Sequence, residues 1–174
     1  VNLFTSRHYE SDSKVFKKFT EITGIKVNLI SGKSKVLEKR IIEEGKNTKA
    51  DILFLADAGA LYSAQSKGLF TKIKSSIVEE KVPKSLRNDH WFGITKRSRI
   101  LFFNPNLISQ KEIKDISYED LSDIKWKNSI AVRQASNIYN QSLIASILEH
   151  NGVKKTEVWL KGLVNNFVRP PQGN

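Results

Sequence analysis

The sequence predicts an α/β fold, with a parallel sheet in its first half. Short apolar runs alternate with helical patterns over the first 70 residues, which gives the order β-α-β-α-β-α. A glycine closes each helical pattern, as expected for helix ends that adopt a left-handed conformation. In such sheets ligands bind beyond the carboxyl ends of the strands. The loops at 6–11, 30–34 and 56–59 are therefore the first places to look for a site.

The elements of this first half follow in order. Residues 1–5 alternate as a strand, and 12–23 form a helix that stops at Gly24. Residues 25–29 alternate again, and a second helix around 36–44 stops at Gly45. The run 52–55 is typical of a buried parallel strand, and a third helix around 61–65 ends before Gly68. We interpret Asp57 as the cap of that helix, although a ligand loop at 57–59 is the alternative.

The second half is less regular. Residues 71–90 are polar and predict irregular structure, whereas 91–94 and 99–103 are two strand-like runs suited to carry the chain from one lobe to another. Beyond them we expect a short helix at 117–121, a strand at 129–132 and two helices at 137–150 and 154–166, separated by Asn151-Gly152. Residues 169–174 have the composition of a loop.

Composition excludes several classes of function. The chain has no Cys, which excludes disulfides, thiolate metal sites and Cys nucleophiles. No run approaches the roughly 18–20 apolar residues that cross a bilayer. The net charge of +11 raises nucleic acid as a partner, but acidic residues are interleaved with the basic ones, which favours a solvated surface. The chain begins on a strand without a signal-like segment, as in a mature secreted protein or a trimmed chain.

The candidate chemistry uses oxygen donors. No nucleophile elbow, phosphate-binding glycine loop or zinc-protease motif is present, so we expect no enzyme. His8 and Tyr9 follow the first strand, Tyr139 opens a predicted helix and Arg99 starts a strand-like run. At neutral pH a phenol keeps its proton unless a highly charged cation displaces it, and a hard ion such as ferric iron suits the resulting phenolate. Each residue also has a simpler interpretation, as loop, packing residue or basic surface.

The sequence resembles the ferric-iron-binding periplasmic proteins of the cyanobacterial type, which are transferrin-like extracellular solute-binding proteins. The motifs that carry the resemblance span nearly the whole chain: Thr5–Tyr9, Phe19–Asn28, Ala50–Leu53, Asp57–Gly59, Trp91–Gly93, Lys96–Arg99, Tyr118–Leu121, Trp126–Lys127, Ser136–Leu143 and Phe167–Asn174. The stretches Ser136–Gln141 and Arg169–Asn174 are specific to this family.

The resemblance implies a class II periplasmic-binding-protein fold of two α/β lobes, here incomplete at the C-terminus. We expect residues 1–94 to form the N-terminal lobe, and 95–174 to form crossover strands and the first part of the C-terminal lobe. The implied metal site takes Tyr9 from the first lobe and Tyr139 from the second, with His8 as a ligand or close neighbour. Arg99 is implied as a neighbour of the site that binds an anion or approaches the metal.

The implied function is binding of Fe3+, with or without a synergistic anion, in the periplasm and delivery to the inner-membrane permease of an ABC importer. The complete protein is expected to be monomeric, without a membrane span or nucleic-acid partner. A solute-binding protein for phosphate or a carboxylate is the alternative, and a basic nucleic-acid-binding domain the remote one. The family completes its site with an adjacent Tyr-Tyr pair that this sequence lacks. We therefore expect the chain to be the N-terminal portion of a longer protein and to bind iron weakly alone.

Overall fold

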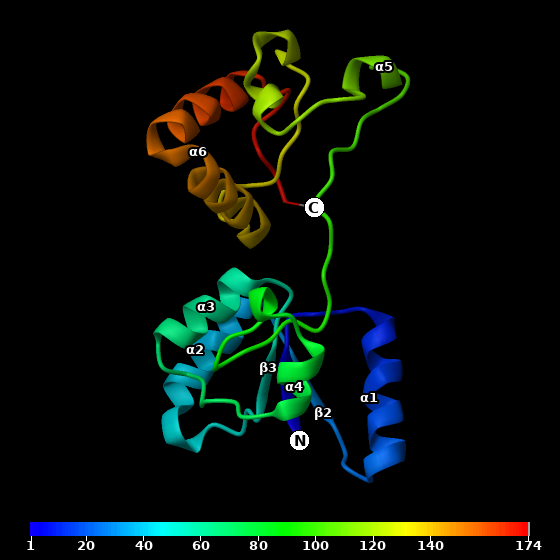
Figure 1. The fold of residues 1–174 in the computed structure, drawn as a ribbon, viewed down its shortest axis with the longest axis vertical. Coiled ribbons are helices and arrows are strands. Elements are labelled where there is room, and N and C mark those ends of the chain that lie inside the picture. The colour runs from blue at the N-terminus through cyan, green and yellow to red at the C-terminus, as the bar shows by residue number, and fades with distance from the viewer. Residues whose placement is uncertain (174) are drawn as a thin grey trace. The chain divides into compact units, whose positions relative to one another are not determined.

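The computed structural model describes residues 1–173, which divide into two compact units (Figure 1). Unit 1 is Val1–Lys96, and unit 2 runs from Arg97 onward. Among the described residues, no helix is both long and apolar enough to cross a membrane.

Unit 1 is built on a three-stranded parallel sheet, as the sequence predicts. Its strands are β1 (Asn2–Thr5), β2 (Asn28–Ser31) and β3 (Ile52–Phe54), in the order β2-β1-β3. Phe4 of β1 is in register with Ile30 of β2 and Leu53 of β3. The crossover from β1 to β2 runs in the opposite direction to the crossover from β2 to β3. Because such crossovers are right-handed, the helices that they contain cover opposite faces of the sheet (Figure 1).

The helices of unit 1 begin and end where local sequence dictates. α1 (Glu10–Thr23) ends at Gly24 with a φ of 71°, and the amide of Gly24 donates to the carbonyl of Thr20. α2 (Ser34–Glu44) ends at Gly45, followed by the 3-10 turn η1 (Gly45–Asn47). α3 (Ala58–Ser66) begins at Asp57, whose carboxylate accepts from the amide of Gly59 at 2.8 Å. The predicted glycine stops and the Asp57 cap are confirmed.

The core of unit 1 lies between the central strand and α2. Phe4 is 1% exposed and packs with Leu37 and Ile41 of α2. On the same helix Glu38 is buried, and it accepts hydrogen bonds from Lys67 and from the hydroxyl of Ser63. The ion pair between Glu38 and Lys67 joins α2 to the end of α3 without leaving a buried carboxylate unpaired. Strand β1 is thereby fixed at the centre of the unit.

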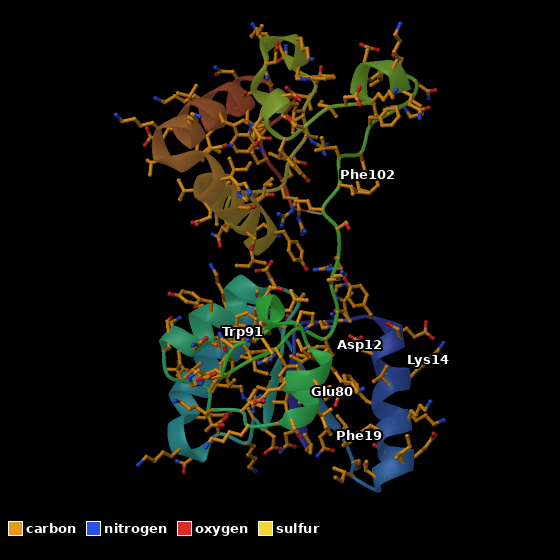
Figure 2. The ribbon with its side chains drawn as sticks, viewed as in Figure 1. Asp12, Lys14, Phe19, Glu80, Trp91 and Phe102 are labelled. Atoms are coloured by element: carbon orange, nitrogen blue, oxygen red, sulfur yellow. The ribbon has the colours of Figure 1, made fainter. Side chains whose placement is uncertain are left out.

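Two predictions for residues 71–103 are wrong. The segment predicted as irregular contains a short helix, α4 (Ser76–Lys81), capped by Ser75, and a 3-10 turn, η2 (Lys84–Leu86). The run 99–103 has no regular secondary structure, and Phe102 on it is 88% exposed (Figure 2). A strand requires a hydrogen-bonding partner, and only the isolated antiparallel bridge between Arg87 and Phe92 forms near these runs in the described part of the chain.

Unit 2 is mainly helical. Its elements are α5 (Gln110–Ile113), the 3-10 turns η3 (Glu119–Ser122) and η4 (Ile124–Trp126), and α6 (Ile138–Asn165). Gly152, with φ 74° and ψ 168°, breaks α6 into the two predicted helices, and Figure 1 shows the change of direction. The predicted strand at 129–132 is instead one isolated bridge, between Ile130 and Phe167. A second isolated parallel bridge joins Arg133 to Gln172, and no continuous ladder links the two bridges.

The core of unit 2 packs around the second half of α6. Ile147, Trp159 and Leu163 form a buried cluster, with Tyr118 packed against it. Asn166 is fully buried, and its side-chain amide donates to the carbonyls of Leu121 and Asp123. These bonds tie the end of α6 to the two 3-10 turns.

Candidate metal centre

His8 and Tyr9 lie between the carboxyl end of β1 and the start of α1. Tyr9 is the residue that precedes α1, and its backbone is extended, with φ −83° and ψ 132°. The rings of His8 and Tyr9 are stacked with their centroids 5.2 Å apart, and Tyr9 is 38% exposed. Both side chains therefore lie at the ligand end of the sheet with polar atoms accessible to a solute.

A half-buried arginine, which the sequence reasoning did not single out, supports this pair. The guanidinium of Arg7 donates from Nε and Nη2 to the two carboxylate oxygens of Asp12, at 2.8 and 2.9 Å. Its Cζ lies 5.0 Å from the ring centroid of Tyr9 and 4.6 Å from that of Phe54. Nη1 also donates to the hydroxyl of Thr95 at 3.3 Å. The only signal in the sequence was the position of Arg7 next to His8, five residues before a carboxylate.

These residues border a hollow of about 230 Å³ on unit 1. Its lining combines the predicted pair and the arginine–aspartate pair with polar and apolar neighbours: Thr5, Arg7, His8, Tyr9, Glu10, Asp12, Ser13, Phe16, Leu29 and Ser31. The carboxylates and imidazole in this hollow are oxygen and nitrogen donors, which hard and borderline cations accept. Among residues 1–173, however, no group of three His, Cys, Asp or Glu side chains could hold a metal ion.

The hydrogen bonds from Arg7, assisted by its charge, lower the pKa of Asp12 below its ordinary value of 3.8, although burial acts in the opposite direction. In the unfolded chain Asp12 takes up a proton at a higher pH than in the folded one. Unit 1 is therefore stabilised by this pair at every pH above about 3.8, and the contribution is lost as the pH falls toward the lower folded pKa.

We expect Asp12→Asn to lower the free energy of unfolding of unit 1 at pH 7 by about 1.5–3 kcal/mol, since it leaves a largely buried guanidinium without its charged partner. The measurement is urea unfolding at a series of pH values between 7 and 3. The variant should also lose part of the acid dependence of the parent chain. Asp89→Asn, at an exposed position in the same unit, is the control and should change neither quantity. Parallel pH profiles for D12N and the parent would contradict the assignment.

Tyr139 lies in the first turn of α6 in unit 2. The side chain of Asn137 caps this turn by accepting from the amide of Tyr139 at 2.9 Å. Nη2 of Arg99 donates to the carbonyl of Tyr139 at 2.6 Å, so the structure brings these two predicted residues together. Two further arginines lie over the Tyr139 ring, with the Cζ atoms of Arg97 and Arg133 at 5.0 and 5.7 Å from its centroid. Sequence reasoning missed both, because Arg97 belongs to a basic run and Arg133 follows an apolar one.

The two other tyrosines fit a metal site less well. Burial raises the pKa of the Tyr118 phenol, although the charge of Arg99 acts in the opposite direction, and Tyr118 packs in the core of unit 2. Its indole neighbour Trp159 donates to the Tyr118 carbonyl at 2.7 Å, which fixes the residue as part of the core. Tyr62 is 67% exposed on α3 and has no cation over its ring in the described part of the chain. Tyr9 and Tyr139 remain as the phenols with cationic neighbours on their rings.

Residues 47–169 match the family described as bacterial extracellular solute-binding protein. The whole chain is 46% identical to iron uptake protein A1 of Synechocystis and covers 48% of it. It is 29% identical over 94% of its length to the major ferric iron-binding protein of Neisseria meningitidis, of which it covers 50%. The chain thus spans about half the length of the curated relatives it matches.

Solved structures give the same picture. A Trichodesmium protein in complex with iron and citrate ligands matches all of this chain with a TM-score of 0.91 and 46% identity. The ferric binding protein from Campylobacter jejuni matches with a TM-score of 0.91 and 40% identity. The chain covers 55% of each of these two-lobe proteins, which confirms the predicted fold class. The chain belongs to the bacterial extracellular solute-binding protein family.

Proposed function

We propose that this chain supplies ferric-iron donors to a periplasmic solute-binding protein that delivers iron to an ABC importer. Tyr9 and Tyr139 are the phenolate donors, His8 is a further ligand or close neighbour, and Arg99 is a neighbour that binds an anion or approaches the metal. The relatives named above carry names for iron uptake and ferric iron binding, and one was solved with iron and citrate. The proposal includes no catalytic step.

The observation that carries the proposal is the position of Tyr9. It stands with His8 at the carboxyl end of the central strand, on the rim of a hollow, with an arginine on its ring. An open strand end supplies the access that a solute needs, and the phenol supplies a hard oxygen donor. A core-packing role would instead place the ring against a hydrophobic cluster, as for the partly buried Tyr118.

The proposal extends to organisation and partners. We take residues 1–94 as the N-terminal lobe and 95–174 as the segment that crosses to the C-terminal lobe and forms its first part. The complete protein is monomeric in the periplasm and docks on an inner-membrane permease. Because this chain contains only two of the phenolates that the family uses, its own affinity for ferric iron is weak.

Titration of the chain with ferric citrate tests the proposal. We expect a weak visible band from phenolate-to-iron charge transfer, which grows with added iron and disappears on reduction with dithionite. The Neisseria ferric iron-binding protein serves as a positive control, and its band should form at far lower iron concentration. Absence of a band at saturating ferric citrate would remove ferric binding from this chain. A band as tight as that of the control would contradict the stated weakness.

An oxyanion such as phosphate or a carboxylate is a second candidate solute, favoured by the arginines around Tyr139. Arg97, Arg99 and Arg133 all contact this one residue, and guanidinium groups bind planar carboxylates and phosphates well. A thermal-shift series with phosphate, citrate and sulfate, each without iron, separates the two candidates. Stabilisation by an anion alone, with no ferric band, would favour the anion as the solute.

A further inference from the structure

Each candidate tyrosine donor has at least one guanidinium over its ring, and the two units achieve this with unrelated residues. In unit 1 the cation is Arg7, from the residue pair just before Tyr9. In unit 2 the cations are Arg97, which lies 42 positions before Tyr139, and Arg133, which lies six positions before it. Neither Tyr62 nor Tyr118 has such a contact among the described residues. A guanidinium over the ring is thus found at both proposed donor tyrosines.

The unit 1 contact is rigidly built. The side chain of Arg7 is 9% exposed and that of Asp12 is 17% exposed, and the two form a bidentate ion pair. The amide of Arg7 donates to the hydroxyl of Thr5 at 3.0 Å, and the amide of Asp12 donates to the carbonyl of Tyr9 at 3.0 Å. Arginine's planar fork loses little freedom in such a pair. The guanidinium is therefore a fixed surface against which the Tyr9 ring rests.

The unit 2 contact is held differently. The side-chain amide of Asn140, one residue after Tyr139, donates to the carbonyl of Arg133 at 2.6 Å. Nε of Arg133 is buried and has no hydrogen-bond partner in the described part of the chain. Burying a donor without an acceptor costs free energy unless another interaction stabilises the charged group. The attraction between the guanidinium and the electron-rich face of the Tyr139 ring is such an interaction. Arg99 fixes the backbone of the same residue through its carbonyl.

We propose that Arg7 in unit 1, and Arg97 with Arg133 in unit 2, are positioning residues that hold the two phenolate rings, and that Arg97 and Arg133 also weaken the donation of the Tyr139 phenolate to ferric iron. This inference rests on the proposed function. A phenolate spreads its negative charge over the ring, so a cation on the face stabilises those electrons. Electrons held at lower energy are donated less readily to the metal. Phenolate-to-iron charge transfer then needs more energy than it would from a ring without the cation.

The effect differs between the units. Asp12 offsets the charge of Arg7, so this residue acts mainly by holding the ring in place. Two guanidinium groups face the ring of Tyr139, and their combined field acts on its electrons. We therefore expect ring mobility to respond to substitution in both units, and the energy of the charge-transfer band to respond chiefly in unit 2.

The test compares Arg7→Gln, the double variant R97Q/R133Q and the double variant R97K/R133K with the parent chain. Arg169→Gln, which removes an exposed arginine from unit 2, is the control for charge loss alone. With ferric citrate, R97Q/R133Q should move the charge-transfer band to longer wavelength. R97K/R133K, which keeps the charges but loses the planar contact, should shift it less, and R7Q and R169Q should leave its wavelength unchanged.

A second readout needs no iron. Carbon-13 relaxation of labelled tyrosine rings, assigned with single Tyr→Phe variants, should show a more mobile Tyr9 in R7Q and a more mobile Tyr139 in R97Q/R133Q. Rings as rigid as in the parent would overturn the positioning role. A weaker band at unchanged wavelength in R97Q/R133Q would overturn the electronic effect. If the parent chain shows no band, the proposed function fails, and the relaxation data still decide whether the arginines hold the rings.

Discussion

Removal of the phenolic oxygen of Tyr139 or Tyr9 is expected to reduce the ferric affinity of the chain by more than about 100-fold. Groups that only orient a metal ligand typically cost 10–100-fold when they are removed, and a lost donor should cost more. Tyr139→Phe and Tyr9→Phe keep the aromatic ring, so the contacts with the arginines persist. Each substitution therefore removes the donor atom and little of the packing.

The measurement is a visible titration with ferric citrate for each single variant and for Y9F/Y139F. Both single variants should lose most of the charge-transfer band, and the double variant all of it. Tyr62→Phe is the matched control, since it makes the same chemical change on an exposed helix face of unit 1. If the band vanishes in Y9F but survives unchanged in Y139F, unit 2 contributes no donor. A full band in the double variant would refute the assignment of both tyrosines.

Local chemistry made the helix ends of this protein predictable. Gly24 and Gly45 have positive φ, which a residue with a Cβ adopts only at a cost, so glycine marks these ends in any context. The Asp57 cap depends on an amide only two residues away. Such features require no knowledge of the rest of the chain, and the same is true of the bend at Gly152.

The errors arose where distant residues decide the outcome. The apolar run at 100–103 suits a strand, but it forms none here because strand formation depends on a partner elsewhere in the chain. The pattern placed His8, Tyr9 and Tyr139 at element ends correctly, yet it gave no sign of their arginines. Arg7 contacts Phe54 and Thr95, which are 47 and 88 positions away. Single-sequence patterns carry no record of such contacts.

Truncation of Phe4 is expected to be the most destabilising single change in unit 1. Phe4 lies on the central strand, is 1% exposed and contacts Leu37 and Ile41, while the guanidinium of Arg40 lies 5.0 Å from its ring centroid. Phe4→Ala removes the ring from this cluster and leaves a cavity, which typically costs about 3–5 kcal/mol. A domain of this size has a total stability of about 5–15 kcal/mol, so the loss should unfold a measurable fraction of unit 1.

Hydrogen exchange measured by mass spectrometry separates this effect from a general loss of structure. Peptides from residues 1–96 should lose protection in F4A, with the largest loss in β1 and α2. Phe102→Ala is the control, because it removes the same ring from a side chain that is 88% exposed and should change the free energy of unfolding by less than about 0.5 kcal/mol. Equal losses in the two variants would show that burial of Phe4 does not stabilise the sheet. Because Tyr9 follows the same strand, F4A should also weaken the ferric band, and Phe102→Ala should leave it intact.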